Sequence, residues 1–474
     1  MLLHFFLLSV YTIIIGYLAW RIWKKTGQIA FVLGTALIYY WSLLGAWFII
    51  FDEMTNQKGK EFGLAYYGYL IDLFPVHADN TYLYAIFLYA LFIIVIQLSV
   101  LFFAKESHGI TNRTEPLVNI NHFWLILFCV TAVIISLLIV WKQVLIAAKF
   151  NQSVYYVTRH YHDGYFTIHQ LLNQAAVVSL YIGLITYISG SRAQYMSGSK
   201  KRYYLYLYVF AVFFVEGYLL FLGNKRELFF SMIFGILFYM ANVNYKINYK
   251  ALIFFVLLIL VPLVFNDGLR SYSPTFLTHY FDVSGLEFNP EKDVIYTQFS
   301  VANTIFRFLF SNEMFVPHFS MYGVLSHHVP FAYGASIVSL IASFIPHFLW
   351  ANRPMGIYEY YVNNVHATAD TGFTIHHATG LYLNFGVAGI VFGALFLGWF
   401  WTFFYNKFLK IDQTKQKFLL VVLIIAFSSF TAQIPSLMRN GPEGYKALIF
   451  EAILIPAVII YFSSLLVKKN KKND

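Results

Sequence analysis

Eleven stretches of this sequence are each apolar over about fifteen residues or more, and this pattern limits the kind of fold that the chain can adopt. A helix needs about 20 apolar residues to cross the roughly 30 Å hydrocarbon core of a bilayer. Because no water reaches the backbone there, each crossing segment must satisfy its own hydrogen bonds, as a helix does. The stretches lie at 2–20, 29–51, 82–104, 122–141, 171–189, 204–222, 228–243, 251–265, 378–405, 418–435 and 447–466.

The composition agrees with a chain that has the lipid bilayer as its solvent. The sequence is 59% hydrophobic and only 11% charged, whereas soluble domains carry roughly a quarter charged residues. We therefore expect an all-α, polytopic protein with about 11 transmembrane helices and a single transmembrane domain over residues 1–474. Basic residues follow the first apolar stretch and do not precede it, so it is expected to be a retained span and not a signal peptide. Cys129, inside an apolar stretch, is expected to serve packing.

The lysines and arginines predict the orientation of the chain. The loops on one side of the predicted membrane hold 19 of them in 66 residues, and the loops on the other side hold 13 in 186. The positive-inside rule then places the N-terminus outside and the lysine-rich C-terminal tail in the cytoplasm. The net charge of +10 lies in these short loops and forms no basic stripe, so nucleic acid is not an expected partner.

A large extracytoplasmic loop, 266–377, is predicted between the eighth and ninth spans. Loops of this length are usually functional or disordered, and the many aromatic residues in this one favour order. We expect turns over Ser271–Pro290 and short helices over Ile295–Phe310 and Phe331–Leu349, which lie on the membrane surface or re-enter it. Twelve of the 15 histidines fall in the predicted outer loops, but their spacing has no metal-binding pattern.

Arginines near the outer membrane face are candidates for binding an anionic group. Arg226 lies beside Lys225 in the predicted five-residue loop 223–227, where a lipid pyrophosphate would be a suitable partner; a snorkelling pair that fixes the helix ends is the alternative. Arg439 lies in the loop 436–446, four residues before Glu443, and an internal salt bridge with Glu443 is equally compatible. The large loop adds three further arginines, Arg270, Arg307 and Arg353.

Two acids, Glu216 and Glu451, fall inside predicted spans. A carboxylate in hydrocarbon is costly, so each is expected to stay neutral, to face a cavity or to pair with an arginine. Both lie toward the predicted outer ends of their helices, so ion pairs with Arg226 and Arg439 are the simplest hypothesis.

One segment resembles a known family. In FIPHFLWANRPMG (344–356), Pro346, Trp350, Arg353 and Pro354 match the signature Pro-x-x-x-Trp-x-x-basic-Pro in the outer loop of O-antigen (Wzy-type) and related oligosaccharide repeat-unit polymerases. The glycine-rich stretch at 374–393, the loop with Arg226 and the late loop with Arg439 are also similar to that family.

The resemblance implies a GT-C-like membrane glycosyltransferase in the bacterial cytoplasmic (inner) membrane. Such an enzyme joins undecaprenyl-pyrophosphate-linked oligosaccharide repeat units into O-antigen, capsule or exopolysaccharide on the outer face, without a cofactor. Its expected partners are polyprenyl-pyrophosphate-linked oligosaccharides, the lipid bilayer, and chain-length regulator and flippase proteins.

This chemistry assigns roles to the candidate residues. The departing pyrophosphate needs its charge neutralised, for which we predict Arg226, Arg353 and Arg439, with Lys225 and Arg270 as weaker candidates. The acceptor hydroxyl needs a base. The candidates for this base are His347, His376 and His377, with Glu443 and Asp370 as rivals. Because arginines can neutralise the leaving group, we expect the reaction to be independent of metal.

Two other readings of the sequence remain open. An O-antigen-ligase-type glycosyltransferase would use the same donor and transfer the glycan to a different acceptor. A transporter or flippase for lipid-linked oligosaccharide would predict two matching halves, and the sequence shows no such internal symmetry.

Overall fold

The protein is described here by a computed structural model, and its described part is helical. The described residues are 1–55, 79–106, 120–160, 166–192, 198–242, 273–287, 312–342, 345, 350, 354–365, 374–410 and 417–470. Within them, the only β-structure is an isolated parallel bridge between Ile375 and Asn440. The prediction of an all-α chain is therefore confirmed for this part of the sequence.

Eight helices among the described residues are long and apolar enough to cross a membrane, and all eight coincide with predicted spans. They are α1 (Leu2–Thr26), the continuous helix formed by α2 (Ile29–Tyr39), η1 (Tyr40–Leu44) and α3 (Gly45–Thr55), α5 (Asn80–Phe103), α6 (His122–Ile139), α9 (Phe166–Arg192), α10 (Gly198–Phe221), α17 (His377–Lys410) and α18 (Lys417–Arg439). This set supports a polytopic membrane protein.

Two further predicted spans are also helical. The stretch 228–243 falls on α11 (Lys225–Asn242), and 447–466 falls on α19 (Gly444–Ile449), η6 (Phe450–Leu454) and α20 (Ile455–Asn470). The stretch 251–265 lies outside the described residues, and so does the helix expected at 295–310. The number of crossings, the orientation of the termini and the single transmembrane domain therefore stay predictions.

The chain divides into two compact units. The first contains residues 1–110, 309–411 and 426–452, and the second contains 111–308, 412–425 and 453–474. Helix α18 contributes its second half to the first unit and its beginning to the second.

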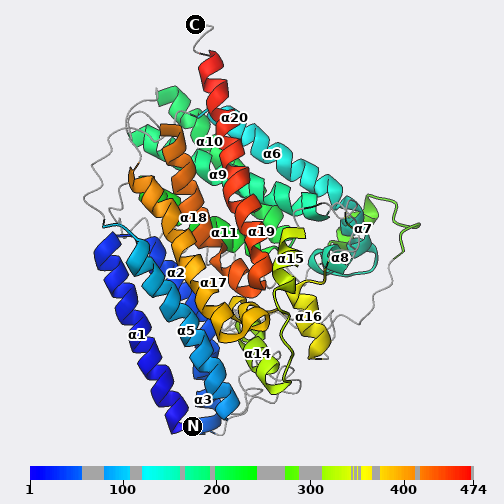
Figure 1. Cartoon of the computed structure of the whole chain (residues 1–474). Helices are drawn as coiled ribbons and strands as arrows, with labels where there is room; N and C mark the ends of the chain where they lie inside the picture. Colours follow the sequence, from blue (N-terminus) through cyan, green and yellow to red (C-terminus); the bar gives the residue numbers. More distant parts are fainter. Residues whose placement is uncertain are drawn as a thin grey trace. The chain divides into compact units, whose positions relative to one another are not determined.

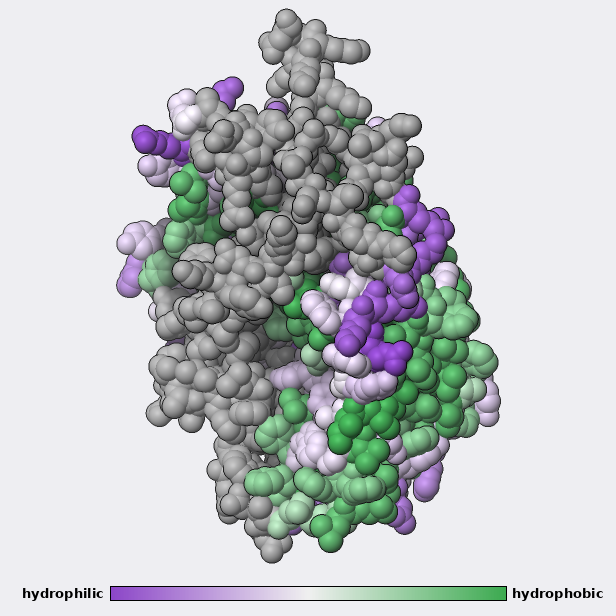
Figure 2. All heavy atoms as spheres, turned by 90° about the vertical axis from the view of Figure 1, so that its left-hand side faces the viewer, coloured by the Kyte–Doolittle hydropathy of each residue, from purple (hydrophilic) through white to green (hydrophobic). Residues whose placement is uncertain are grey.

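Helix α5 forms the centre of the first unit, where it packs against α1 and α17 (Figure 1). The Asp79 side chain caps its first turn by accepting a hydrogen bond from the Tyr82 backbone N–H at 2.7 Å. Helix α1, by contrast, exposes large apolar side chains such as Leu2 (77% exposed), Phe6 and Ile13. Figure 2 shows the side of the molecule where α1 lies. Hydrophobic residues form a continuous area over much of its coloured surface. A face of this kind is suited to lipid.

The π-helical turn η1 interrupts the second apolar helix. Beside it lies a buried helix that the sequence did not predict. Helix α14 (Asn312–Ser326) belongs to the loop 266–377, yet it packs against η1, α5 and α17. Its side chains Phe315, Phe319 and Met321 are fully buried. Part of the predicted outer loop therefore builds the core of the first unit.

Helix α17 is broken near its start. Phe385 and Gly386 have non-helical backbone angles, and Gly386 lies at φ 61° and ψ −144°. Asn384 fixes the break, since its Nδ2 donates to Ser336 Oγ at 2.6 Å and to the Gly380 carbonyl at 2.7 Å. The predicted span 378–405 therefore coincides with α17 but contains a break that the sequence did not predict.

The predicted helix over 331–349 is shorter than expected. In its described part, only α15 (Ala335–Ala342) is helical. Tyr333 and Gly334 have positive φ angles of 45° and 86°, which a helix cannot accommodate. The preceding segment also packs on the break in α17, where the Ala332 N–H donates to the Leu383 carbonyl at 2.7 Å.

Replacement of Gly386 by alanine is expected to destabilise the protein by about 1–3 kcal/mol, because its backbone angles are accessible almost only to glycine. The measurement is the apparent Tm of the detergent-purified chain. Gly16→Ala is the matched control, since Gly16 lies within α1 and a Cβ there meets no atom within 4 Å. Equal Tm values for wild type and Gly386→Ala would contradict the break described here.

The second unit contains α6, α9, α10 and α11, joined by buried polar contacts. Ser136 on α6 lies at its centre, with its Oγ 2.7 Å from both His169 Nδ1 and Asn173 Oδ1 and 2.9 Å from the Tyr218 hydroxyl. The same unit holds α7 (Trp141–Lys149), α8 (Val154–His160) and η3 (Thr275–His279). Residues 273–287 consist of η3, turns at Tyr280 and at Ser284–Gly285, and irregular chain, so the turns predicted for 271–290 are found in part of this segment.

Candidate functional site

Three segments far apart in the sequence meet in the first unit: one follows the predicted Arg353, and the other two contain or adjoin His376, His377, Arg439 and Glu443. The first ends the signature segment at Pro354–Ile357, the second precedes α17 at Thr374–His377, and the third is the turn η5 (Gly441–Glu443) after α18. The bridge between Ile375 and Asn440 joins the second segment to the third. A contact of Glu443 joins the third to the first.

Glu443 anchors the helix that follows the signature segment. Its Oε1 accepts a hydrogen bond from the Ile357 N–H at 2.8 Å, at the first residue of α16 (Ile357–Asn364). A carboxylate at this position satisfies one of the free N–H groups of a helix start. The approach requires glycine at 356, because a Cβ there would lie 2.5 Å from Glu443 Oε1.

The turn η5 fits closely against both other segments. Gly441 has φ 62°, a left-handed conformation that lets the chain reverse after α18. Pro442 packs on Gly380 of α17, where a Cβ would lie 2.5 Å from the proline ring. Gly441 itself lies between Ile375 and Ile357. The three segments are therefore held as one rigid cluster.

Arg439 lies at the edge of this cluster. It is the last residue of α18 and is half-buried, next to Asn440 of the bridge. A cation in the last helical turn interacts favourably with the helix dipole, so part of its role is structural. The binding of an anion by Arg439 stays a prediction.

His377 and His376 are both completely buried at the start of α17. The His377 ring packs edge-on against Tyr445, with ring centroids 5.2 Å apart, and at 5.9 Å from Phe92. The two adjacent histidines thus lie in the interior of the first unit.

His376 is fixed as a neutral ring by hydrogen bonds on both nitrogens. Its Nδ1 accepts from the Ala378 N–H at 3.1 Å, so the ring proton lies on Nε2. Nε2 then donates to Ser42 Oγ at 3.0 Å, and the Ser42 hydroxyl donates to the Ile38 carbonyl at 2.7 Å. In this arrangement the free electron pair of the ring is engaged by backbone, which favours a structural role. Its role as a base stays a prediction.

A second neutral histidine, His318 of α14, lies on the other side of Ser42. Its Nδ1 is 2.7 Å from the Ser42 carbonyl, which can only accept, so Nδ1 carries the proton. Its Nε2 accepts from the Tyr82 hydroxyl at 2.7 Å. In the π-helical turn η1, the Ser42 side chain therefore contacts His376 and the Ser42 carbonyl contacts His318. Such turns occur frequently at functional sites.

Hydroxyl groups complete this buried network. The Tyr89 hydroxyl donates to the carbonyls of Pro317 and His318 at 3.0 and 2.9 Å and lies 3.3 Å from Thr379 Oγ1. Ser320 Oγ lies 2.9 Å from Thr379 Oγ1 and accepts from the His376 N–H at 3.1 Å. The network connects α5 and α14 to the start of α17. It therefore helps to fix the position of the segment Thr374–His377 in the cluster.

Burial sets the protonation state of these histidines. It lowers the pKa of His318 to about 4, although the hydrogen bond to the Ser42 carbonyl acts in the opposite direction. Burial also holds the pKa of His376 well below its usual value, and the neighbouring His377 and His318 lower it further. Both rings are therefore neutral at physiological pH.

The stability of the protein is expected to fall as the pH is lowered from about 6.5 toward 4. The unfolded chain binds protons at histidine near pH 6.5, whereas folded His318 does so only near pH 4, so folding excludes protons in this range. The loss for His318 alone reaches about 3 kcal/mol below pH 4 and vanishes above pH 6.5. The measurement is the apparent Tm between pH 7.5 and 4.5.

Two variants make this pH dependence specific. His318→Asn removes the titrating ring and should lower the Tm at pH 7 but reduce its fall with pH. His279→Gln is the control, because His279 is exposed and should leave the profile unchanged. An identical fall in Tm for wild type and His318→Asn would contradict the assignment.

The second unit holds Arg226 and Lys225 in the first turn of α11, after a tight turn at Leu222–Asn224. Gly223, with φ 70°, allows this turn. The connection is shorter than the predicted loop 223–227, because Lys225 and Arg226 already belong to α11. Arg226 is half-buried, and the neighbouring Glu227 is buried. Arg226 and Arg439 thus belong to different units.

Glu216, the predicted carboxylate within a span, is held by hydroxyl groups. Its Oε1 accepts hydrogen bonds from Tyr181 at 2.9 Å and from Ser231 at 3.4 Å. These donors stabilise a carboxyl group inside the helices of the second unit. The ion pair of Glu216 with Arg226 stays a prediction, and so does the one proposed for Glu451.

Several predicted site residues lie outside the described residues or their described side chains. Those outside the described residues are His347, Arg353, Arg270, Arg307 and Asp370, and the undescribed side chains are those of Lys225 and Glu451. Within the described part of the chain, no group of three histidine, cysteine or acidic side chains could hold a metal ion. Cys129 is buried and unpaired, as expected of a packing residue.

Sequence reasoning missed the residues of the buried network. Ser42, Tyr82, Tyr89 and His318 were not singled out for the site, since each lies in an apolar stretch or in an unassigned part of the loop. The one available signal was the spacing of Tyr82 and Tyr89, seven residues apart and therefore on one face of α5.

The chain was compared with protein families, with curated proteins and with solved structures. No family, no curated protein and no solved structure matches it.

Proposed function

We propose that this protein polymerises undecaprenyl-pyrophosphate-linked oligosaccharide repeat units into a surface polysaccharide on the outer face of the bacterial cytoplasmic membrane. One observation carries the proposal. The end of the polymerase-like signature, the segment before α17 and the Arg439 loop are built into one cluster through Glu443 and the bridge between Ile375 and Asn440. These are three of the four regions that resemble the polymerase family.

The reaction breaks the bond between the sugar C1 of the growing glycan and its pyrophosphate oxygen. A hydroxyl oxygen of the incoming lipid-linked repeat unit forms the new bond to C1, and its proton passes to a base. The polyprenyl pyrophosphate departs with the electron pair of the broken bond, and its added negative charge must be neutralised. The donor is already activated, so positioning and charge neutralisation are the main tasks of the protein.

Arginine side chains suit the pyrophosphate, because a planar guanidinium donates two parallel hydrogen bonds to phosphate oxygens. In this proposal Arg439 binds the leaving group at the edge of the cluster, together with Arg353 of the signature. Arg226, Lys225 and Arg270 belong to the second unit, and their part in binding stays a prediction from the sequence. No step requires a metal.

The base is proposed among His347, His377 and Glu443. His376 is the least suitable of the candidates, because both of its nitrogens are engaged in hydrogen bonds inside the network. Glu443 has one oxygen bound to the start of α16, so we assign it a positioning role as well.

A transporter of lipid-linked oligosaccharide is retained as a second candidate, since the break at Phe385 and Gly386 in α17 is a feature that transporters use to bind substrates within the membrane.

Deletion of the gene, followed by analysis of the surface glycan, tests the proposal. A polymerase predicts single repeat units on the cell surface and loss of the polymer ladder, restored by the wild-type gene. Long chains that accumulate on the carrier lipid would indicate a ligase instead, and repeat units retained inside the cell would indicate a flippase. An unchanged ladder would remove all three functions.

A further inference from the structure

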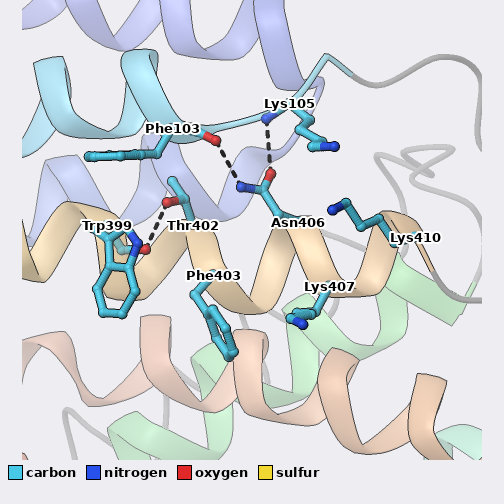
Figure 3. Close-up of a pocket in the computed structure, with 8 residues that line it drawn as sticks. All are labelled: Phe103, Lys105, Trp399, Thr402, Phe403, Asn406, Lys407 and Lys410. Atoms are coloured by element: carbon cyan, nitrogen blue, oxygen red, sulfur yellow. Dashed lines mark hydrogen bonds between the residues drawn. The ribbon is translucent and has the colours of Figure 1, made fainter.

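A hollow lined by three lysines lies at the far end of α17 from the candidate site. It forms where the end of α5 meets the last turns of α17, and its volume is about 190 Å³ (Figure 3). The residues that line it are Phe103, Lys105, Trp399, Thr402, Phe403, Asn406, Lys407 and Lys410. None of them belongs to the cluster described above.

Asn406 holds the two helices together at this hollow. Its Nδ2 donates to the Phe103 carbonyl at 2.8 Å, and its Oδ1 accepts from the Lys105 N–H at 2.9 Å (Figure 3). The Tyr405 hydroxyl also donates to the Lys105 carbonyl at 3.2 Å. The backbone of Lys105 is therefore fixed on α17, and its side chain shares a rim with Lys407 and Lys410.

The lining of the hollow combines cationic and aromatic side chains. Lys105, Lys407 and Lys410 are all exposed, and Glu106 beside Lys105 leaves the charge of the group positive. Trp399 and Phe403 are its aromatic residues on α17 and are 41% and 38% exposed. Lys407 Nζ lies 5.5 Å from the centre of the Phe403 ring. Lysines above aromatic rings are typical of the boundary between headgroups and hydrocarbon.

The length of α17 agrees with a position of this hollow at one membrane surface. After the break, Gly386 to Lys410 rises by about 36 Å at 1.5 Å per residue, close to the roughly 30 Å thickness of the hydrocarbon core. Below the hollow, Phe396 on α17 and Leu98 and Phe102 on α5 expose apolar side chains to the surroundings. Acyl chains could therefore follow the helices from the hollow into the bilayer.

We propose that this hollow binds the phosphate headgroup of an anionic phospholipid, with the three lysines on the phosphate and the aromatic rings against the glycerol region. Its volume is below the roughly 300–1,000 Å³ of pockets that enclose a whole drug-sized ligand, which fits a headgroup whose tails stay in the bilayer. By the positive-inside prediction this surface is cytoplasmic, where anionic lipids attract basic residues. The proposal requires a membrane-spanning chain but not the polymerase activity.

Native mass spectrometry of the full chain, released from mixed micelles, tests the proposal. Phosphatidylglycerol is expected to be retained at least tenfold more than phosphatidylcholine. The variant with Lys105→Gln, Lys407→Gln and Lys410→Gln should lose at least five-sixths of that retained phosphatidylglycerol. The matched control replaces Arg21, Lys24 and Lys200 by glutamine, because these three exposed cations lie in predicted cytoplasmic loops but outside the hollow. It should change retention less than twofold.

Three results would overturn the proposal. Equal loss in the control variant would show diffuse attraction of anionic lipid to basic residues. Displacement of phosphatidylglycerol by millimolar inorganic phosphate, with phosphate retained in its place, would assign the hollow to a free anion. Unchanged retention of phosphatidylglycerol in the triple variant would show that the hollow does not bind the lipid. Should the triple variant not fold, Lys410→Glu is the second variant, and unchanged retention there has the same meaning.

Discussion

Alanine in place of Arg439 is expected to reduce polymer formation by about a hundredfold or more, with little change in the amount of protein in the membrane. Arg439 is proposed to neutralise the departing pyrophosphate, and removal of one preorganised donor to a developing charge typically costs about 10²–10³ in rate. It is half-buried at the edge of the cluster, so its loss should affect the reaction more than the fold. The measurement is the polymer ladder formed by a deletion strain that carries the variant.

The lysine variant refines this test. Arg439→Lys keeps the positive charge but cannot donate two parallel hydrogen bonds, so an intermediate loss of about tenfold is expected. Arg226→Ala and Arg353→Ala extend the series to the other predicted members. Arg21→Ala is the control, since Arg21 is exposed near the end of α1 and bonds the Tyr17 hydroxyl.

The series has one decisive negative outcome. Full activity in all three alanine variants, at membrane levels equal to wild type, would show that these arginines do not bind the leaving group. The enzyme proposal would then lose its main chemical support. A loss confined to Arg439→Ala and Arg353→Ala would keep the cluster of the first unit as the site and exclude Arg226 from it.

The membrane-spanning helices were predictable because hydropathy is a local property of the sequence. The stretches 82–104 and 122–141, for example, coincide with α5 and α6 within a few residues at each end. The start of α5 lies two residues before the predicted one, and there the Asp79 side chain caps the helix.

Helix α14 was missed because its pattern is not that of a membrane span. Pro317 and His318 interrupt the apolar residues, and both would weaken a helix that faced lipid. Inside the protein they are tolerated, since Tyr82 and Ser42 satisfy the His318 ring and Tyr89 binds the carbonyl of Pro317. These contacts are set by packing between distant segments, which the local sequence does not record.

The candidate site was predictable in its residue types but not in its connections. Arg439, Glu443 and His377 were found because charged and titratable side chains are rare in this chain. The contact of Glu443 with Ile357 joins residues 86 positions apart, and that of Ser42 with His376 joins residues 334 apart. Only the fold shows that Glu443 binds the start of α16 and that Ser42 helps to keep the His376 ring neutral.

Glu443→Ala is expected to reduce polymer formation at least tenfold and to lower the free energy of unfolding by about 1–3 kcal/mol. The substitution leaves the Ile357 N–H without its partner at the start of α16. Helix α16 directly follows the signature segment, so its release should also displace Arg353. The measurements are the polymer ladder and the apparent Tm of the purified chain. Glu359→Ala is the matched control, because Glu359 is an exposed acid in the first turn of the same helix.

Glu443→Gln separates anchoring from proton transfer. The glutamine carbonyl oxygen can still accept the hydrogen bond from Ile357, but an amide cannot take a proton from the acceptor hydroxyl. A positioning role predicts activity within about threefold of wild type and an unchanged pH profile. Should Glu443→Gln be as inactive as Glu443→Ala while its Tm equals that of wild type, the carboxylate would be the base. The proton from the acceptor hydroxyl would then pass to the turn η5, and the histidines at the start of α17 would be structural.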